Sequence, residues 1–253
     1  MDLAIKGKRA LVTGASRGIG RAIAETLARE GADVAICARG SEGVVGAVAA
    51  LKALDCRAFG TALDVRDATA FEAWVSDAVD HLGGVDIVVS NVSTRIDPKS
   101  PTWWPDSFEA DLMQHIRLKS LVLPYLREGA SLIFVASIAA SLVTLPPYEE
   151  AYGAMKAGLV NLVGQWAQVL GPRGIRVNAV SPGPIDFAGG WWDKVRIANP
   201  EAYQRARSLA ALGRLGAPDD VANAVAFLAS PRAAFVSGAN LRIDGGLIKA
   251  ANF

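Results

Sequence analysis

The chain has 253 residues, of which 51% are hydrophobic and 20% charged, and its formal net charge at neutral pH is +1. This composition supports a large apolar core and excludes a disordered chain, and the balanced charge argues against a global field for nucleic acids or membrane surfaces. Two cysteines and two histidines are too few for a metal-ligand cluster, and without a signal-peptide pattern or a membrane-length apolar run we expect a cytoplasmic protein that binds neither metal, membrane nor nucleic acid.

Short β-branched apolar runs alternate with longer amphipathic stretches along the chain. Strands are expected at residues 9–13, 33–38, 57–63, 85–90, 131–136, 176–180 and 240–243. Helices are expected between them, at residues 18–30, 68–82, 108–126, 152–170 and 218–229. This alternation predicts a single α/β domain over residues 1–253, with a Rossmann-like, doubly wound fold in which a seven-stranded parallel sheet carries helices on both faces.

A glycine-rich turn follows the first expected strand and opens the first expected helix. Its sequence is Thr13-Gly14-Ala15-Ser16-Arg17-Gly18-Ile19-Gly20. Glycines let the backbone turn tightly and approach a pyrophosphate, which the free N–H groups and the positive end of the helix dipole can bind. An ordinary strand–helix turn is the alternative, but the strand before it and the helix after it favour a nucleotide site.

The end of the second expected strand favours NADP(H), with NAD(H) as the second choice. An NAD site usually has an acidic residue at this position, whereas this chain has Ala38 followed by Arg39. Without a carboxylate a 2′-phosphate is not repelled, so Arg39 can bind it bidentately and Arg17 can add a second positive charge. The alternative is that both arginines are solvated surface side chains.

A tyrosine and a lysine carry the predicted proton chemistry. Tyr152 and Lys156 are four residues apart in a helical stretch and therefore share a face. An ammonium group close to a phenol favours its ionised form, so the tyrosine can exchange an alcohol proton near neutral pH. Ser137 ends the fifth expected strand, at the carboxyl edge of the sheet, where its hydroxyl can bind the substrate oxygen. A lengthened loop leaves Ser141 as the alternative serine. Tyr148, in the same loop, is the weaker alternative base, because no lysine lies four residues after it.

The motifs together resemble the short-chain dehydrogenase/reductase family over nearly the whole chain. They are the glycine turn, Asp64-Val65, Asn91, Ser137, Tyr152-Gly-Ala-Met-Lys156, Asn178, Ser181-Pro182-Gly183, Gly213-Arg214-Leu215-Gly216 and Asp244-Gly245-Gly246.

The resemblance implies a set of cofactor ligands and an assembly. The ligands are Gly14, Ser16, Arg17, Gly18, Ile19, Gly20, Arg39, Asp64, Val65, Asn91, Tyr152, Lys156, Pro182, Gly183 and Ile185. Within this set, Asp64 accepts a hydrogen bond from the adenine amine and Lys156 bonds the nicotinamide ribose. A helix N-cap is the alternative role for Asp64, although Asp67 or Thr69 suits that role better. The family also implies a homo-oligomer, in particular a tetramer.

Three positions depart from the family pattern. Ser93 replaces a glycine that leaves room for the nicotinamide half of the cofactor. His115 aligns with a helix asparagine that holds a water beside the lysine, so it is a candidate proton relay, with a merely packed helix histidine as the alternative. Phe187 aligns with a threonine that bonds the carboxamide, a role that backbone groups near Ile185 can take over.

Residues 187–212 lack a strand and read as a substrate-lid insertion. Trp191-Trp192 lie in it, and Trp103-Trp104 follow the fourth expected strand. Four indoles favour a bulky apolar or aromatic substrate, unless they pack the lid or form a subunit interface.

We therefore expect an NADP(H)-dependent oxidoreductase that interconverts a ketone or aldehyde and an alcohol. A 3-oxoacyl thioester reductase is the alternative enzyme. From a different class, Ser93 and His115 favour a low-turnover dinucleotide-binding regulator, whereas an intact Ser137, Tyr152 and Lys156 argue against it.

Overall fold

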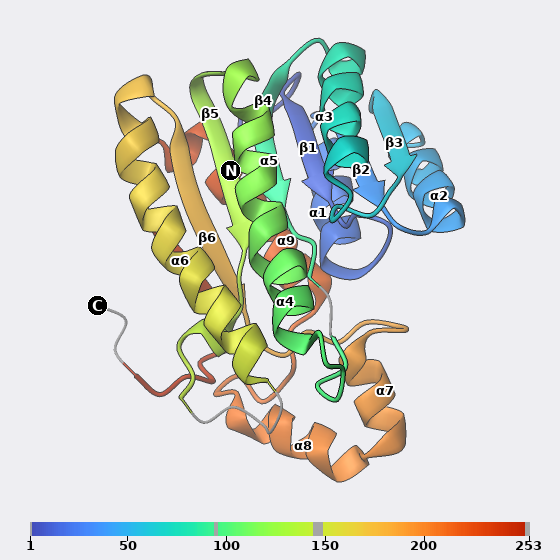
Figure 1. Ribbon diagram of the computed structural model, residues 1–253, viewed down its shortest axis with the longest axis vertical. Coiled ribbons are helices and arrows are strands. Elements are labelled where there is room, and N and C mark those ends of the chain that lie inside the picture. Colours follow the sequence, from blue (N-terminus) through green and yellow to red (C-terminus); the bar gives the residue numbers. More distant parts are fainter. Residues whose placement is uncertain (1, 94–95, 144–148, 251–253) are drawn as a thin grey trace.

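A computed structural model describes residues 2–93, 96–143 and 149–250 of the chain, and its centre is a seven-stranded parallel sheet (Figure 1). The strand order is β3-β2-β1-β4-β5-β6-β7, and every neighbouring pair is parallel. The strands are β1 (Arg9–Thr13), β2 (Asp33–Ala38), β3 (Ala58–Ala62), β4 (Val85–Ser90), β5 (Leu126–Val135), β6 (Arg176–Pro182) and β7 (Asn240–Ile243). The predicted doubly wound sheet is confirmed.

Helices cover both faces of this sheet, as predicted. One face carries α1 (Gly18–Arg29), α2 (Ser41–Lys52) and α9 (Pro218–Ala229), and the other carries α3 (Ala68–Leu82), α5 (Gln114–Val122) and α6 (Glu150–Leu170) (Figure 1). The sequence analysis did not identify α2, whose small and glycine residues give it a weak helical signal.

Alternating side chains of each strand supply two separate cores. In β1, Ala10 and Val12 pack into the core under α1 and α9, whereas Leu11 packs into the core under α3, α5 and α6. Because both faces of the strands are buried in this way, the strands read as continuous apolar runs in the sequence.

The prediction of one continuous helix over residues 108–126 is wrong, because the structure interrupts it. The structure has α4 (Trp103–Phe108), a π-helical turn (Glu109–Met113) and then α5, and residues 123–125 form a 3₁₀ turn before β5 begins at Leu126. An apolar repeat does not distinguish these helix types, because a π turn adds a single residue to one turn. Turns of this kind occur frequently at functional sites.

The predicted insertion after β6 folds as two helices, α7 (Trp191–Ala198) and α8 (Pro200–Leu209), and contains no strand within its fully described span. Figure 1 shows both helices beyond the carboxyl ends of the strands. That edge lies next to the point where the strand order reverses between β1 and β4, which is where ligands of such sheets bind.

The described residues contain neither a membrane-spanning helix nor a cluster of metal ligands. None of the described helices is long and apolar enough to cross a membrane. The same part of the chain contains no group of three or more His, Cys, Asp or Glu side chains that could hold a metal ion.

Candidate functional site

The turn between β1 and α1 requires glycines for two reasons: the backbone conformation and the close approach of neighbouring atoms. Gly14 and Gly18 have φ angles of +68° and +57°, a region that other residues rarely adopt. A Cβ atom at Gly18 would lie 2.5 Å from Cζ of Phe187, and one at Gly20 would lie 2.4 Å from the Gly14 carbonyl oxygen. Arg17, the N-cap of α1, makes no side-chain cap hydrogen bond, so the first N–H groups of the helix stay available to an anion.

Asn91 at the end of β4 holds this turn in place. Its side-chain nitrogen Nδ2 donates to the carbonyl oxygens of Thr13 (3.0 Å) and Gly14 (3.2 Å), and its backbone N–H donates to the Thr13 hydroxyl (3.0 Å). The side chain of this predicted cofactor ligand is therefore used to join β1 to β4 at the switch point.

The end of β2 and the start of α2 form a corner beside the turn. Ser16 lies against the first turn of α2, since a Cβ at Gly43 would be 3.1 Å from Cβ of Ser16. Arg39 is exposed just before this helix, whose N-cap, Gly40, makes no side-chain cap hydrogen bond. Arg17 is also exposed, but its Nη1 donates to the Gly189 carbonyl of the lid segment at 3.2 Å. The structure thus brings Ser16 and Arg39 to one corner and turns Arg17 toward the lid.

Asp64, the predicted adenine acceptor, follows β3 and forms an ion pair that the sequence analysis missed. Both carboxylate oxygens accept from Arg66, with the shortest contact at 2.6 Å, and this guanidinium holds the pKa of Asp64 below its ordinary value. Asp67, not Asp64, caps α3 by accepting from the Ala70 N–H at 3.0 Å. Val65 is buried, and its carbonyl accepts from Arg117 at 3.3 Å.

Tyr152 and Lys156 occupy the first two turns of α6. Lys156 is fully buried, its Nζ donates to the Val135 carbonyl at 3.3 Å, and this Nζ lies 5.7 Å from the centroid of the Tyr152 ring. Tyr152 is half-buried. The ammonium and the phenol are therefore neighbours, on the face of α6 that looks toward β5.

Ser137 lies directly after β5 and caps the short 3₁₀ turn Ile138–Ala140, which packs against α6 and β6. Its hydroxyl oxygen accepts from the Ala139 N–H at 3.1 Å, which leaves the hydroxyl hydrogen free to donate. Ser141, the alternative, follows this turn and lies farther from the strand end. Tyr148, the alternative base, lies outside the described residues.

His115 is completely buried in α5. Its Nδ1 is 2.6 Å from the Ser90 hydroxyl, its ring meets Phe134 edge-on at 6.1 Å, and its Nε2 has no hydrogen-bond partner among the described residues. Burial, and then the positive charge of Lys156, lower the pKa of His115 well below its ordinary value. At neutral pH the ring is therefore an uncharged group, with one nitrogen anchored and the other open.

Two polar residues beside Lys156 were not predicted as a pair. The Asp111 carboxylate lies 3.6 Å from Lys156 Nζ, and Ser93 donates to the same carboxylate oxygen at 2.6 Å. The sequence analysis treated Ser93 only as a crowding residue and did not select Asp111. A single acid in an amphipathic stretch gives no signal that it faces inward.

After β6, the backbone of residues 184–186 forms hydrogen bonds with Gly216 on one side only. Pro182 ends the strand, and a Cβ at Gly183 would lie 2.9 Å from Cα of Asp244, so a glycine is required by close approach. Asp186 N–H donates to the Gly216 carbonyl (2.8 Å) and Gly216 N–H donates to the Pro184 carbonyl (3.0 Å). Because backbone groups alternate along an extended chain, those of Ile185, which lies between them, point to the opposite side.

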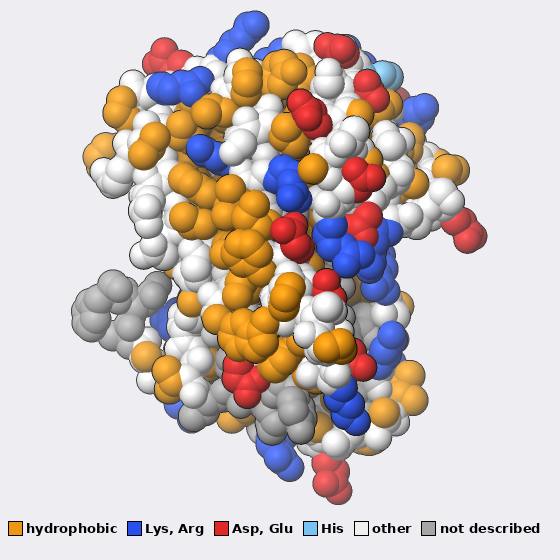
Figure 2. All heavy atoms as spheres, in the orientation of Figure 1, with side chains coloured by type: hydrophobic (Ala, Val, Ile, Leu, Met, Phe, Trp, Pro, Cys, Tyr) orange, Lys and Arg blue, Asp and Glu red, His pale blue; other side chains and the backbone are white. Residues whose placement is uncertain are grey.

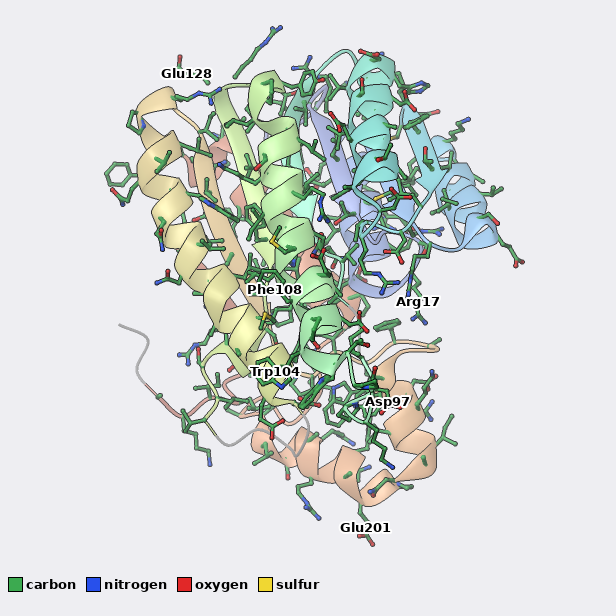
Figure 3. The ribbon with its side chains drawn as sticks, in the orientation of Figure 1. Arg17, Asp97, Trp104, Phe108, Glu128 and Glu201 are labelled. Atoms are coloured by element: carbon green, nitrogen blue, oxygen red, sulfur yellow. The ribbon has the colours of Figure 1, made fainter. Side chains whose placement is uncertain are left out.

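The two tryptophan pairs singled out by the sequence lie in α4 and in α7. Trp103 and Trp104 contact each other at 5.7 Å between ring centroids, and Figure 3 places Trp104 on α4, at the end of the molecule where α7 and α8 lie. Trp104 and Trp191 are both 48% exposed, so neither indole belongs to the buried core.

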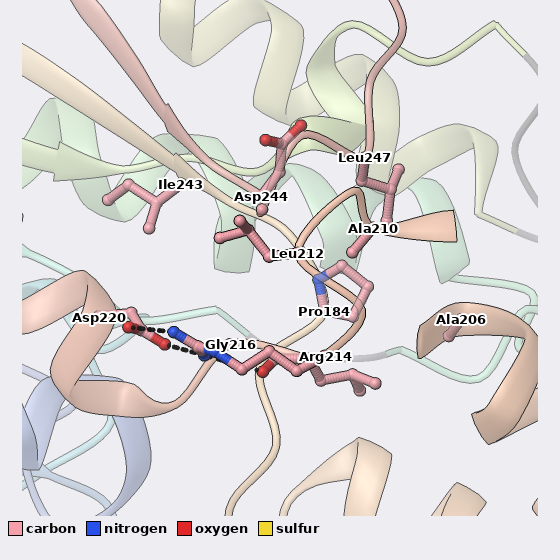
Figure 4. A pocket seen from close by; sticks show the side chains of 12 residues that line it. Pro184, Ala206, Ala210, Leu212, Arg214, Gly216, Asp220, Ile243, Asp244 and Leu247 are labelled. Atoms are coloured by element: carbon pink, nitrogen blue, oxygen red, sulfur yellow. Dashed lines mark hydrogen bonds and ion pairs between the residues drawn. The ribbon is translucent and has the colours of Figure 1, made fainter. Parts of the chain in front are cut away.

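A separate pocket lies behind the lid. Figure 4 shows it between the Arg214-containing segment before α9 and the turn after β7, with Ala206 and Ala210 on its lid side. Ser137, Tyr152 and Lys156 do not line it. Arg214 and Asp220, which both line it, are joined by two hydrogen bonds.

Comparison with known proteins identifies relatives over nearly the full length. Residues 14–248 match the family model described as enoyl-(acyl carrier protein) reductase. The chain is 37% identical to an isoepoxydon dehydrogenase of Penicillium expansum over 249 residues, which cover 96% of this chain and 95% of that protein. It is 38% identical to a 3-oxoacyl-[acyl-carrier-protein] reductase of Vibrio cholerae over 252 residues, covering 96% and 98%.

A solved structure shows the same fold. The chain superposes on a short-chain dehydrogenase from Burkholderia cenocepacia J2315 in complex with NADP, with a TM-score of 0.87 and 35% sequence identity, over 96% of this chain and 98% of that chain. The range matched by the family model, residues 14–248, includes Gly14, Ser137, Tyr152, Lys156 and the segment of α7 and α8.

Proposed function

Because the chain belongs to the short-chain dehydrogenase/reductase family, we propose that it is an NADP(H)-dependent oxidoreductase that interconverts a ketone or aldehyde and an alcohol on a bulky apolar or aromatic substrate. The observation that carries the proposal is the buried ammonium of Lys156, 5.7 Å from the Tyr152 ring, at the strand edge that also holds the glycine turn. A merely structural helix has no need of a buried charge beside a half-exposed phenol.

The residues present fit a dinucleotide. Cβ atoms at Gly18 and Gly20 of the glycine turn would collide with neighbouring atoms, so the backbone there must stay bare. The N-terminus of α1 directly follows this turn and has no side-chain cap. In this proposal the turn and α1 bind the pyrophosphate, Val65 and Asp64 flank the adenine, and the outward-facing backbone groups of Ile185 bond the carboxamide.

The preference for NADP(H) is supported by the corner at Ser16 and Arg39. Both side chains lie beside the N-terminus of α2, which adds further unpaired N–H groups, and a 2′-phosphate would meet no carboxylate at the end of β2. The Burkholderia cenocepacia relative, whose structure contains NADP, supports the same preference.

The nicotinamide, when bound, donates or accepts the hydride. In carbonyl reduction, Ser137 donates a hydrogen bond to the substrate oxygen and stabilises its developing charge. Tyr152 transfers its phenolic proton to that oxygen. Lys156 stabilises the phenolate that remains and bonds the nicotinamide ribose. The free Nε2 of His115, a neutral ring anchored by Ser90, is available to hold a water beside the lysine or to relay the proton.

The substrate class rests on the tryptophans of α4 and α7, two of which are nearly half exposed. Indoles at an entrance favour flat apolar or aromatic groups. A 3-oxoacyl thioester reductase is the second candidate, favoured by the Vibrio cholerae relative. We also propose a homotetramer, since apolar side chains remain exposed on α4 and α6.

A spectrophotometric screen separates the two candidates. Aromatic and bicyclic ketones, small ketones and a 3-oxoacyl thioester are each offered with NADPH and with NADH, and the loss of nicotinamide absorbance is followed. We expect the highest kcat/KM with NADPH and a bulky aromatic ketone. Activity with the thioester alone would favour the 3-oxoacyl thioester reductase instead. A higher kcat/KM with NADH than with NADPH would contradict the proposed cofactor preference.

A further inference from the structure

The ammonium of Lys156 has a buried carboxylate beside it. Lys156 Nζ and Asp111 Oδ1 are 3.6 Å apart, and both side chains are only 1% exposed. At that separation the contact is an ion pair and is longer than a hydrogen bond. Ser93 donates to the same oxygen of Asp111 at 2.6 Å, and Ser93 itself is exposed at the end of β4. The carboxylate is thus fixed between the lysine and the open side of the site.

A buried ammonium needs such a partner. Out of water, a lone lysine tends to release its proton, because burial disfavours the charged form. Among the described residues, Lys156 Nζ has one other close polar contact, the Val135 carbonyl at 3.3 Å. A carbonyl dipole accepts a hydrogen bond but does not neutralise a full charge, so the charge balance of this site depends on Asp111.

The other titratable groups near Lys156 cannot replace that charge. His115, on the neighbouring α5, is neutral because burial and Lys156 itself lower its pKa. Tyr152 lies on the same helix and is the proton donor of the proposed reaction. Glu109, on the same π-helical turn as Asp111, is directed at Arg117, 3.4 Å away.

The remaining charged side chains of the elements that pack against α6 are also directed elsewhere. Asp106 of α4 accepts from Thr102. Arg173, after α6, donates to the carbonyls of Leu123 and Leu126, and Arg176 of β6 donates to those of Leu228 and Ser230.

The π-helical turn is the local reason why an acid can lie here. Asp111 occupies the middle of Glu109–Met113, between α4 and α5. The extra residue in this turn shifts the direction of the side chains that follow relative to a regular helix. Asp111, through its ion pair, and His115, through the effect of the lysine charge on its pKa, both lie near Lys156 on this side.

We propose that Asp111 is a positioning residue whose carboxylate keeps Lys156 in its charged form inside the closed site, with Ser93 holding that carboxylate in place. This inference rests on the proposed function, in which Lys156 must be charged to stabilise the phenolate. It adds a third ionic group to the Tyr152–Lys156 pair.

The test follows the proton on Lys156 directly. The side-chain nitrogen resonance of Lys156 is recorded by NMR against pH in isotope-labelled protein without cofactor or substrate, and it is assigned by its loss in Lys156→Met. In Asp111→Asn we expect Lys156 to release its proton at least about one pH unit lower than in the parent, because an opposite charge within a few ångströms has been removed. Glu109→Gln is the matched control, since it removes one negative charge from the same turn and should leave the resonance unchanged.

An Asp111→Asn titration that coincides with that of the parent would overturn the proposal. Because the titration needs neither cofactor nor substrate, it is independent of the screen for activity. If activity is found, the alkaline limb of carbonyl reduction should move in the same direction, since removing a negative charge makes both Lys156 and Tyr152 release their protons at lower pH. A purely structural role for Asp111 would lower the rate without moving that limb.

A second variant covers the case in which Asp111→Asn does not fold. Removing both charges, with Asp111→Leu and Lys156→Met together, leaves no buried ion to compensate. Recovery of cooperative thermal unfolding in the double variant, when the single variant is unfolded, supports Asp111 as the partner of the lysine charge. If both variants are unfolded, Asp111 has another structural duty and the proposal fails.

Discussion

Arg39 is the residue that decides the cofactor preference in this account. It is exposed beside Ser16 and the N-terminus of α2, where a guanidinium can bind a 2′-phosphate bidentately. We expect Arg39→Ala to weaken NADPH binding by about ten- to hundredfold, the usual worth of hydrogen bonds to a charged group, and to leave NADH binding nearly unchanged. Fluorescence titration with both cofactors measures this. Arg29→Ala, at the far end of α1, is the control, and equal losses for both cofactors in Arg39→Ala would refute the phosphate role.

Helix α9 shows how an ion pair supports one element. Asp220 accepts from Arg214 at 2.6 and 2.9 Å and from the Ala217 N–H at 2.7 Å, and these contacts, the guanidinium first, lower the pKa of Asp220 from 3.8 to about 2. A carboxyl group with a lowered pKa stabilises the fold above its ordinary value, and this contribution is lost as the pH falls toward 2.

Asp220→Asn should therefore lower Tm at neutral pH, by a modest amount because the pair is partly exposed. The difference from the parent should shrink as the pH falls from 3.8 toward 2. Asp219→Asn, in the same helical turn and exposed, is the control. A difference in Tm that does not change with pH would show that the carboxylate charge is not the stabilising feature. Thermal unfolding followed by circular dichroism provides these values.

For the whole molecule, the exposed apolar surface predicts assembly. Figure 2 shows hydrophobic side chains gathered over α4 and α6, and the exposed fractions of Phe108 and Val169 are 40% and 68%. A surface of this kind favours contact with a second copy. We expect light scattering at micromolar concentration to report a tetramer, and a stable monomer would contradict this.

The sequence predicted the strands and the glycine turn better than the side-chain pairs inside the candidate site. The strands could be read because parallel strands buried on both faces leave continuous apolar runs, and the glycine turn because its spacing is set by backbone geometry. The π-helical turn could not be read, since apolar periodicity does not record one added residue. For the same reason the inward direction of Asp111 was missed. The pairs of Ser93 with Asp111 and of Asp64 with Arg66 exist only once the chain has folded.

The central claim is that Tyr152 transfers the proton while Lys156 holds the charge, and the rate of NADPH-dependent carbonyl reduction by Tyr152→Phe tests it most directly. This change removes one hydroxyl, so we expect kcat to fall about 10²- to 10⁴-fold while the Kd for NADPH and the Tm stay near those of the parent. Tyr148→Phe, whose residue lies outside the described part of the chain, should keep nearly full turnover. Retained turnover in Tyr152→Phe together with its loss in Tyr148→Phe would contradict the account and place the proton donor in the loop before α6.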